Sequence, residues 1–154
     1  MPVMDIPAPI DWLEAHSRCL ADSYRHWTGK GLIDPGDIPL ATALWQAPYI
    51  LVSHNGASDP ILNYGNRAAL DLWQMDWLDF TKTPSRYTAE PDKRAARHEM
   101  LARAGESGLI TDYSGIRISS RGQRFMIRQA TIWTLLAQGA PCGQAAMFHD
   151  WDYL

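Results

Sequence analysis

Three residues whose side chains could together carry out catalysis lie close together in the sequence, namely Ser53, His54 and Asp59. A serine, a histidine and a carboxylate make up a hydrolytic triad, in which the histidine activates the serine hydroxyl. The sequence around Ser53 lacks the G-x-S-x-G pattern that places a nucleophilic serine on a sharp turn between a strand and a helix. We therefore predict no catalytic residue. We interpret His54 as the end of a strand, hydrogen-bonded into the turn at Asn55-Gly56.

Histidines adjoin carboxylates at two other places, His98-Glu99 and His149-Asp150-Trp151-Asp152. Neither place has two histidines four residues apart, the spacing that puts both on one face of a helix to bind zinc. Adjacent residues on a strand point to opposite faces, so His149 and Asp150 do not readily share an ion. We predict no metal site. The two cysteines, Cys19 and Cys142, form no motif, and we expect reduced thiols in a cytoplasmic protein.

The composition indicates one globular domain. The chain has 154 residues, of which 46% are hydrophobic and 20% charged, and seven are tryptophans. A formal net charge of -3 argues against direct nucleic-acid binding. The sequence shows no signal peptide and no apolar run long enough to span a membrane, so we expect no membrane association. Ten of the 14 lysines and arginines lie between Lys82 and Arg128, either as a solvated face or as an anion site.

The N-terminal part predicts a loose arm and one long helix. Asp11 followed by Glu14 resembles a capping box, and the helix should run from about Trp12 to Trp27 and end at Gly29. One face of this helix carries, at spacings of three and four, Leu13, His16, Leu20, Tyr24 and Trp27. This face packs on its own domain, pairs with the same helix of a second copy, or does both. We assign residues 1–39 to the arm and helix and residues 40–154 to the main domain.

The main domain opens with a helical turn, two strands and a helix. The segment 40–46 should carry Trp45 into the core, and strands at 49–53 and 61–64 should be joined through Asn55-Gly56. Asn66 is a good N-cap for a helix over 67–73. A short helix around Trp77 follows. The longest downstream helix should open at Glu90-Pro91, run to about Ala104 and end at Gly105 or Gly108. Its basic side chains should mostly face water, namely Lys93, Arg94, Arg97 and Arg103.

The last third predicts three long strands, over 109–119, 124–136 and 143–151. Gly115 indicates a bulge or a close approach of neighbouring groups. Along the second strand, strict alternation places on one face Phe125, Ile127, Gln129, Thr131, Trp133 and Leu135. The order β-β-α-α-α-β-β-β predicts an α+β fold, in which a five-stranded antiparallel sheet carries helices on one face.

Several short motifs together resemble the MEKHLA domain, a PAS-like family. They are Ser53-His54, Asp59-Pro60-Ile61, Asn63-Tyr64, Asn66-Arg67-Ala68-Ala69-Leu70, Pro84-Ser85-Arg86, Asp112-Tyr113-Ser114-Gly115-Ile116-Arg117, Gly122 with Phe125, Trp133, and Gly143-Gln144-Ala145-Ala146. The resemblance covers about residues 40–154 and implies a PAS-like sheet with helices on one face. It implies no established ligand or reaction. The chain lacks the homeodomain and zipper of the plant relatives, so their DNA binding is not carried over.

A PAS-like fold raises the question of a bound cofactor, which the sequence leaves unknown. A haem would need a histidine in or near the long helix, and His98 is the candidate, although a surface histidine is the alternative. A flavin photosensor needs a cysteine on a helix that faces the ring. Cys19 and Cys142 lie outside the region of that helix, which argues against covalent photochemistry.

A PAS-like fold also places helices across the sheet, so that inward residues of both would line a small-molecule pocket. From the helices and the break after them we predict Trp73, Trp77 and Arg86, with Arg86 able to bind a carboxylate or phosphate. From the strands we predict Gln129, Trp133 and Gln144. The alternative is that tryptophans fill the core and that Gln129 lies outside on the sheet.

These features predict a stand-alone PAS-like sensory module that binds a small molecule reversibly. Its output would pass to an unknown protein partner or through a homodimer formed by the N-terminal helix. Two alternatives remain open, a small enzyme that uses the same cavity and a ligand-free interaction module with a filled core.

Overall fold

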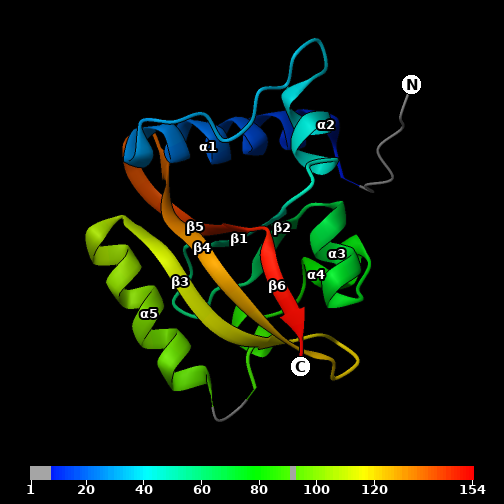
Figure 1. The fold of residues 1–154 in the computed structure, drawn as a ribbon. Helices are drawn as coiled ribbons and strands as arrows, with labels where there is room; N and C mark the ends of the chain where they lie inside the picture. Colours follow the sequence, from blue (N-terminus) through cyan, green and yellow to red (C-terminus); the bar gives the residue numbers. More distant parts are fainter. Residues whose placement is uncertain (1–7, 91–92) are drawn as a thin grey trace.

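An antiparallel sheet forms the centre of the fold (Figure 1). The computed structural model describes residues 8–90 and 93–154. The strands are β1 (Ile50–Asn55), β2 (Leu62–Gly65), β3 (Leu109–Ile118), β4 (Arg124–Ala137), β5 (Ala140–Phe148) and β6 (Asp150–Tyr153). Their order is β2-β1-β5-β4-β3, and β6 also pairs with β4. The predicted α+β class and antiparallel sheet are confirmed, with the expected closing strand divided into β5 and β6 on either side of His149.

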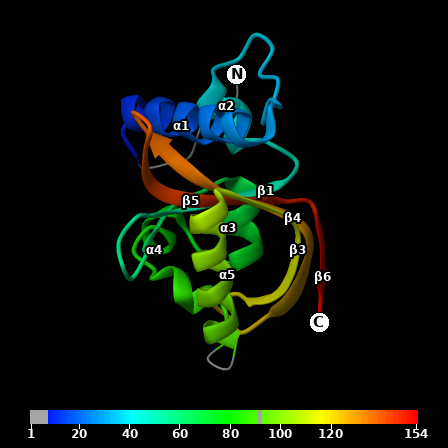
Figure 2. The ribbon, with the colours of Figure 1, turned by 90° about the vertical axis from the view of Figure 1, so that its left-hand side faces the viewer.

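Helices cover both faces of this sheet (Figure 2). On one side lie α1 (Ile10–Thr28) and α2 (Leu40–Trp45). On the other lie α3 (Arg67–Trp73), α4 (Trp77–Phe80), the 3-10 helix η1 (Ser85–Thr88) and α5 (Arg94–Ser107). The helices of the main domain after β2 thus share one face, as expected, while the N-terminal helix packs on the opposite face. No helix in the described ranges is both long and apolar enough to cross a bilayer.

The apolar stripe of α1 packs on its own sheet. Leu13 and Leu20 are fully buried within the single chain, and the ring nitrogen of Trp27 donates to the carbonyl oxygen of Thr134 at 2.9 Å. The helix ends at Gly29 as predicted, with a left-handed φ of 72° that suits glycine. The predicted capping box is wrong, because the helix begins at Ile10 and no side chain caps its first turn.

Asn66 is the N-cap of α3, as predicted, and it does more than cap. Its Oδ1 accepts from the backbone N–H groups of Ala69 and Leu51, at 3.1 and 3.2 Å. Its Nδ2 donates to the carbonyl oxygens of Leu44 and Tyr49, at 3.2 and 2.9 Å. One fully buried amide therefore joins α2, β1 and α3.

Two compensating bulges change the alternation in the β3–β4 pair. The register shifts between Ile110 and Tyr113 and again between Tyr113 and Gly115. Two residues in this region have positive φ, Asp112 at 57° and Gln129 at 52°. Each bulge adds one residue to its strand, so the side chains beyond it exchange faces. This phase change decides which residues of β4 meet the helices.

The prediction of a single alternating face on β4 is consequently wrong. Phe125 and Ile127 face the helices α3 and α5, and beyond the bulge Ala130 and Ile132 take that side. Trp133 lies on the opposite face, where its ring nitrogen donates to the carbonyl oxygen of Leu20 on α1 at 3.3 Å. Gln129 is the bulged residue and is exposed.

The long downstream helix, α5, begins at Arg94 and ends at Gly108, whose φ is 81°. The expected start at Glu90-Pro91 falls partly outside the described residues. A Cβ at Gly108 would overlap the ring of Trp27, so glycine is needed there for space as well as for conformation. Of the basic side chains expected to face water, Arg97 is buried at 8% exposure, which contradicts that prediction.

Candidate ligand-binding site

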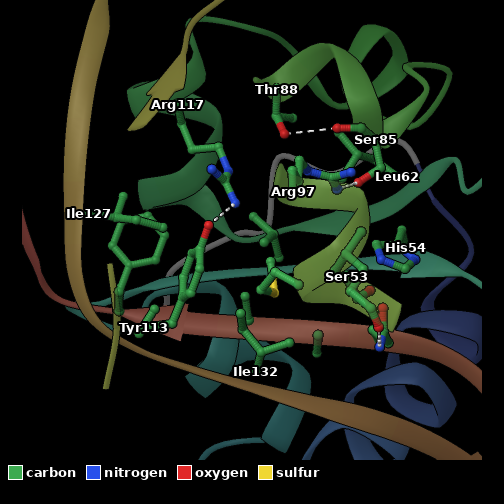
Figure 3. A pocket seen from close by; sticks show the side chains of 18 of the residues that line it. Ser53, His54, Leu62, Ser85, Thr88, Arg97, Tyr113, Arg117, Ile127 and Ile132 are labelled. Atoms are coloured by element: carbon green, nitrogen blue, oxygen red, sulfur yellow. Dashed lines mark hydrogen bonds between the residues drawn. The ribbon is translucent and has the colours of Figure 1, made fainter. Parts of the chain in front are cut away.

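A small cavity lies between the sheet and the helices η1 and α5 (Figure 3). Its volume is about 60 Å³. Most of its wall is apolar and includes Val52, Leu62, Met100, Ile127, Ile132 and Phe148. Several polar side chains enter this apolar space from different elements, and this combination is the usual form of a small-molecule site.

Two arginines line the cavity, Arg97 from α5 and Arg117 from β3, and each is only 8% exposed. Arg97 donates to the hydroxyl of Ser85. Arg117 donates to the carbonyl oxygen of Ile116 at 2.8 Å and to the phenol oxygen of Tyr113 at 3.2 Å (Figure 3). Within residues 8–90 and 93–154, neither guanidinium forms an ion pair with a carboxylate.

Burial, together with the nearby charge of Arg117, lowers the pKa of Arg97 to about 10. Even so, Arg97 stays protonated at neutral pH. The largely apolar wall of the cavity therefore carries two positive charges. An unpaired buried charge is costly, so such a pair needs a physical explanation.

Local structure holds both arginines in place. Ser85 opens η1, where its backbone N–H donates to the carbonyl oxygen of Pro60 at 2.8 Å. A Cβ at Gly115 would lie 2.5 Å from the Tyr113 hydroxyl oxygen and 3.1 Å from an Arg117 nitrogen. The absence of a side chain at Gly115 thus lets the Tyr113 and Arg117 side chains meet above it. The close approach predicted at Gly115 is confirmed.

His54 enters the cavity from β1 (Figure 3). Its Nδ1 lies 2.9 Å from the carbonyl oxygen of Asn55, so Nδ1 carries the proton and donates. Its Nε2 is buried and has no hydrogen-bond partner in the described part of the chain. Burial lowers the pKa of His54, and the charge of Arg97 acts in the same direction. The ring is therefore neutral near pH 7 and presents Nε2 as an acceptor.

Two of the six residues predicted for the pocket line this cavity, Trp73 and Gln144. Trp73 comes from α3, and its buried ring nitrogen has no partner among the described residues. Gln144 comes from β5 and donates through Nε2 to the carbonyl oxygen of Leu101 on α5 at 3.0 Å. This bond joins the sheet to the helix at the edge of the cavity.

The other four predicted residues lie elsewhere. The bulge in β4 places Gln129 at the surface and Trp133 on the opposite face of the sheet, under α1. Trp77 packs edge-to-face against Tyr64 and Trp45, with ring centroids 5.7 and 6.4 Å apart, outside the cavity. Arg86 lies at the surface, where it pairs with the carboxylate of Asp59. Whether any of the six contacts a ligand stays a prediction.

The residues considered for a triad are not assembled. The Ser53 hydroxyl donates to Oδ1 of Asn63 at 2.5 Å and lies 2.9 Å from Nε2 of His16, not against His54. Asp59 is occupied by Arg86. His54 bonds to the backbone of Asn55, which agrees with our interpretation of it as a residue bonded into the turn.

Three further cavity residues were not predicted from the sequence, namely Arg97, Arg117 and His54. A detectable signal existed for Arg97, because Met100, Leu101 and Ala104 follow it at helical spacings of three, four and seven. The run of basic residues around it favoured a solvated face instead. For Arg117 the signal was its shared strand face with Tyr113 and Gly115, which the bulge at Asp112 obscured.

The chain was compared with protein families, curated proteins and solved structures. The model of the MEKHLA domain matches residues 14–153. The chain belongs to the MEKHLA domain family. The match begins within α1, so it extends further toward the N-terminus than the resemblance at residues 40–154. No curated protein matches the sequence.

Solved PAS and light-oxygen-voltage domains share the fold. A PAS domain from Colwellia psychrerythraea has a TM-score of 0.60 at 11% identity, covering 70% of this chain and 90% of that one. Another match is a PAS domain in complex with ethanol, from a LuxR-family transcriptional regulator of Burkholderia thailandensis. It has a TM-score of 0.57 at 19% identity, covering 76% of this chain and 98% of that one. A light-oxygen-voltage domain studied with a flavin analogue has a TM-score of 0.58 at 18% identity, covering 77% of this chain and 86% of that one. These likenesses establish a PAS-like fold for this MEKHLA domain.

The cavity does not fit a flavin. Sites for ligands of drug size occupy roughly 300–1,000 Å³, whereas this cavity measures about 60 Å³. Neither cysteine lines it, since Cys19 lies on α1 and Cys142 is exposed on β5. His98, the haem candidate, is exposed on α5 and does not line the cavity. The described residues contain no group of three or more His, Cys, Asp or Glu side chains arranged to hold a metal.

Proposed function

We propose that this MEKHLA domain is a sensory module that reversibly binds a small molecule in the cavity between the sheet and α5. The observation that carries the proposal is the set of polar groups around the apolar cavity. Arg97 and Arg117 are buried there without a carboxylate partner in the described ranges, and His54 Nε2 has no hydrogen-bond partner there. A bound molecule would satisfy groups that are otherwise costly to bury.

Ligand binding has a short structural route to α1. His54 lines the cavity, and its neighbour Ser53 accepts a hydrogen bond from His16 of α1 at 2.9 Å on the other side of the sheet. A shift of β1 would therefore change the contact between the sheet and α1. We propose that binding shifts the population of α1 positions and that a partner detects this change.

The partner contact would use the outer face of α1. Leu20 is fully buried within one chain, so it is not available for a dimer contact. The exposed face carries charged side chains, among them Asp11, Arg18, Asp22 and Arg25. We propose that a homodimer or a partner protein contacts this face. Analytical ultracentrifugation of wild type and of Arg18→Glu/Arg25→Glu tests the homodimer, since an unchanged mass in a folded variant removes α1 as its basis.

We also propose that the protein is located in the cytoplasm. The support is that Cys19 and Cys142 are both free thiols, as expected for a reducing compartment.

The test of ligand binding starts from protein purified from its own host and examined by native mass spectrometry for a retained small molecule. Ala130→Val adds two methyl groups at a fully buried position on the cavity wall and should reduce retention. Ala137→Val makes the same change at the exposed end of β4 and should leave retention unchanged. A protein that retains no molecule, and that Ala130→Val destabilises by overpacking while Ala137→Val does not, would instead be an interaction module with a filled core.

A further inference from the structure

The charges on the cavity wall point to the chemical class of the molecule. We infer that the ligand is a small carboxylate, held between Arg97 and Arg117, with its short apolar part against the aliphatic wall of the cavity. This inference rests on the proposed function, because it names the ligand of the same site.

The placement of charge around the cavity favours an anionic ligand. The ion pairs among the described residues are at least partly exposed to solvent, namely Arg86–Asp59, Arg124–Glu90, Arg128–Asp150 and Arg128–Asp152. Arg97 and Arg117 are the buried arginines among the described residues, and no carboxylate described here pairs with them. Two like charges in an apolar wall repel each other, so an anion between them would compensate both.

The cavity wall also carries hydrogen-bond donors that lack an acceptor among the described residues. A guanidinium has five N–H donors in a planar fork that matches a carboxylate. Within the described residues, Arg97 makes one hydrogen bond with its fork, to Ser85, and Arg117 makes two, to Ile116 and Tyr113. The buried ring N–H of Trp73, on the same cavity wall, has no partner there either. Apart from the acceptor Nε2 of His54, the unpartnered groups described on the cavity wall are therefore donors, and a bound acceptor would satisfy them.

The size and polarity of the cavity favour a small ligand with an apolar part. A cavity of about 60 Å³ limits the ligand to a few heavy atoms. Phosphate or sulfate would satisfy the arginines but would leave the aliphatic side chains of Val52, Leu62 and Ile132 without contact. A carboxylate with a short alkyl tail matches both parts of the wall.

The test uses the full chain, freed of retained ligand by unfolding and refolding, and two probes of the same shape. Sodium propionate carries the carboxylate, and propionamide replaces it with a neutral amide. Ionic strength is held constant with sodium chloride, and binding is measured by isothermal titration calorimetry and by the shift in Tm. We expect propionate to bind and to raise Tm, and propionamide to do neither.

Variants identify the groups that bind propionate. Arg97→Met and Arg117→Met should each weaken propionate binding by about tenfold or more, as expected for lost hydrogen bonds to a charged group. Each variant should be at least as stable as wild type without ligand, because an uncompensated buried charge is removed. Arg103→Met, at an exposed position of the same helix, is the matched control and should bind like wild type. Unchanged binding in both cavity variants would overturn the inference.

Two further outcomes separate the inference from the proposed function. Binding of propionamide but not propionate would overturn the carboxylate assignment and leave a ligand-binding module in place. Binding of neither probe, with no molecule retained from the host, would overturn both.

Asp92 lies outside the described residues, so Asp92→Asn is included. Propionate binding equal to that of wild type supports the inference. Propionate binding that appears only in this variant overturns it, because Asp92 would then be the counter-ion of the two arginines.

Discussion

His16 shows how burial tunes a single residue in this fold. Its ring stacks on Trp12 with centroids 4.7 Å apart, and it lies 5.6 Å from the ring of Tyr64. The Ser53 hydroxyl donates to Asn63, so it is His16 Nε2–H that donates to Ser53. Burial lowers the pKa of His16 from the ordinary value of 6.5 to about 4. The residue is therefore neutral in the folded protein at any physiological pH.

This lowered pKa predicts a pH-dependent stability. Below pH 6.5 the unfolded chain binds a proton at His16 that the folded chain does not bind, so stability falls as the pH drops through the window from 6.5 to about 4. The expected loss from this residue between pH 7 and pH 5 is about 2 kcal/mol. Urea unfolding of wild type and His16→Gln at both pH values checks it. The glutamine variant should lose less stability, and parallel losses would contradict the assignment.

Asn66 predicts a larger effect on stability. Asn66→Ala leaves two backbone N–H groups and two carbonyl oxygens without their partner. Since each buried unsatisfied group costs about 1–3 kcal/mol, we expect a loss of at least about 3 kcal/mol in urea unfolding. Asp76→Ala removes the exposed N-cap of α4 and should cost only about 1 kcal/mol. Similar losses in both variants would mean that Asn66 acts as a cap alone.

At the scale of elements, the bulges in β3 and β4 decide the function of the sheet. They bring Tyr113 and Arg117 to the same face as Ile132, and they send Trp133 to the face under α1. A regular pair of strands would place Trp133 in the space that the cavity now occupies. The left-handed backbone at Gln129 is thus a requirement of the site, although its exposed side chain touches nothing in the cavity.

Substitutions at Gln129 test this requirement. Gln129→Gly should keep or raise stability by up to about 1 kcal/mol, because glycine adopts a positive φ without steric cost. Gln129→Ile should lower stability by about 1–2 kcal/mol, although isoleucine is a favoured strand residue. Thr131→Ile, at a regular position of β4, is the control and should not destabilise. Thermal unfolding measures all three, and a stabilising Gln129→Ile would argue against the bulge.

At the scale of the molecule, the sheet carries helices on both faces, with α3 and α5 on one and α1 on the other (Figure 2). Side chains from α3 and α5 line the cavity, and α1 accepts the hydrogen bond from Trp133 through the carbonyl oxygen of Leu20. The family match, which begins at residue 14, includes most of α1. The division into residues 1–39 and 40–154 stays a prediction, and the packing of α1 bears on it directly.

A truncation tests this division. A chain of residues 40–154 would expose the apolar face that now packs against Leu13 and Leu20. We expect it to lose near-ultraviolet circular dichroism and to bind a hydrophobic dye, as a loosely packed state does. A truncated chain that unfolds cooperatively, with the dichroism of the full chain in the tryptophan region, would show that residues 40–154 fold independently.

Local patterns in the sequence were sufficient for most of the fold. The helix ending at Gly29, the N-cap at Asn66 and the three long C-terminal strands depend on neighbours along the chain, and their residue types determine them. The family motifs were likewise readable from the sequence. Trp73 and Gln144 reached the cavity because their elements are regular and their inward faces follow from simple periodicity.

The rest of the site was decided by tertiary structure. One bulged residue, Gln129, reversed the alternation of β4, and no local pattern marks where a strand gains a residue. Arg97 and Arg117 lie 20 residues apart in the sequence, on a helix and a strand, and only the packing of α5 on the sheet brings both to one cavity. Basic side chains are ordinarily solvated, so their type predicts exposure. Their burial is a property of the space between elements, which the order of residues along the chain does not specify by itself.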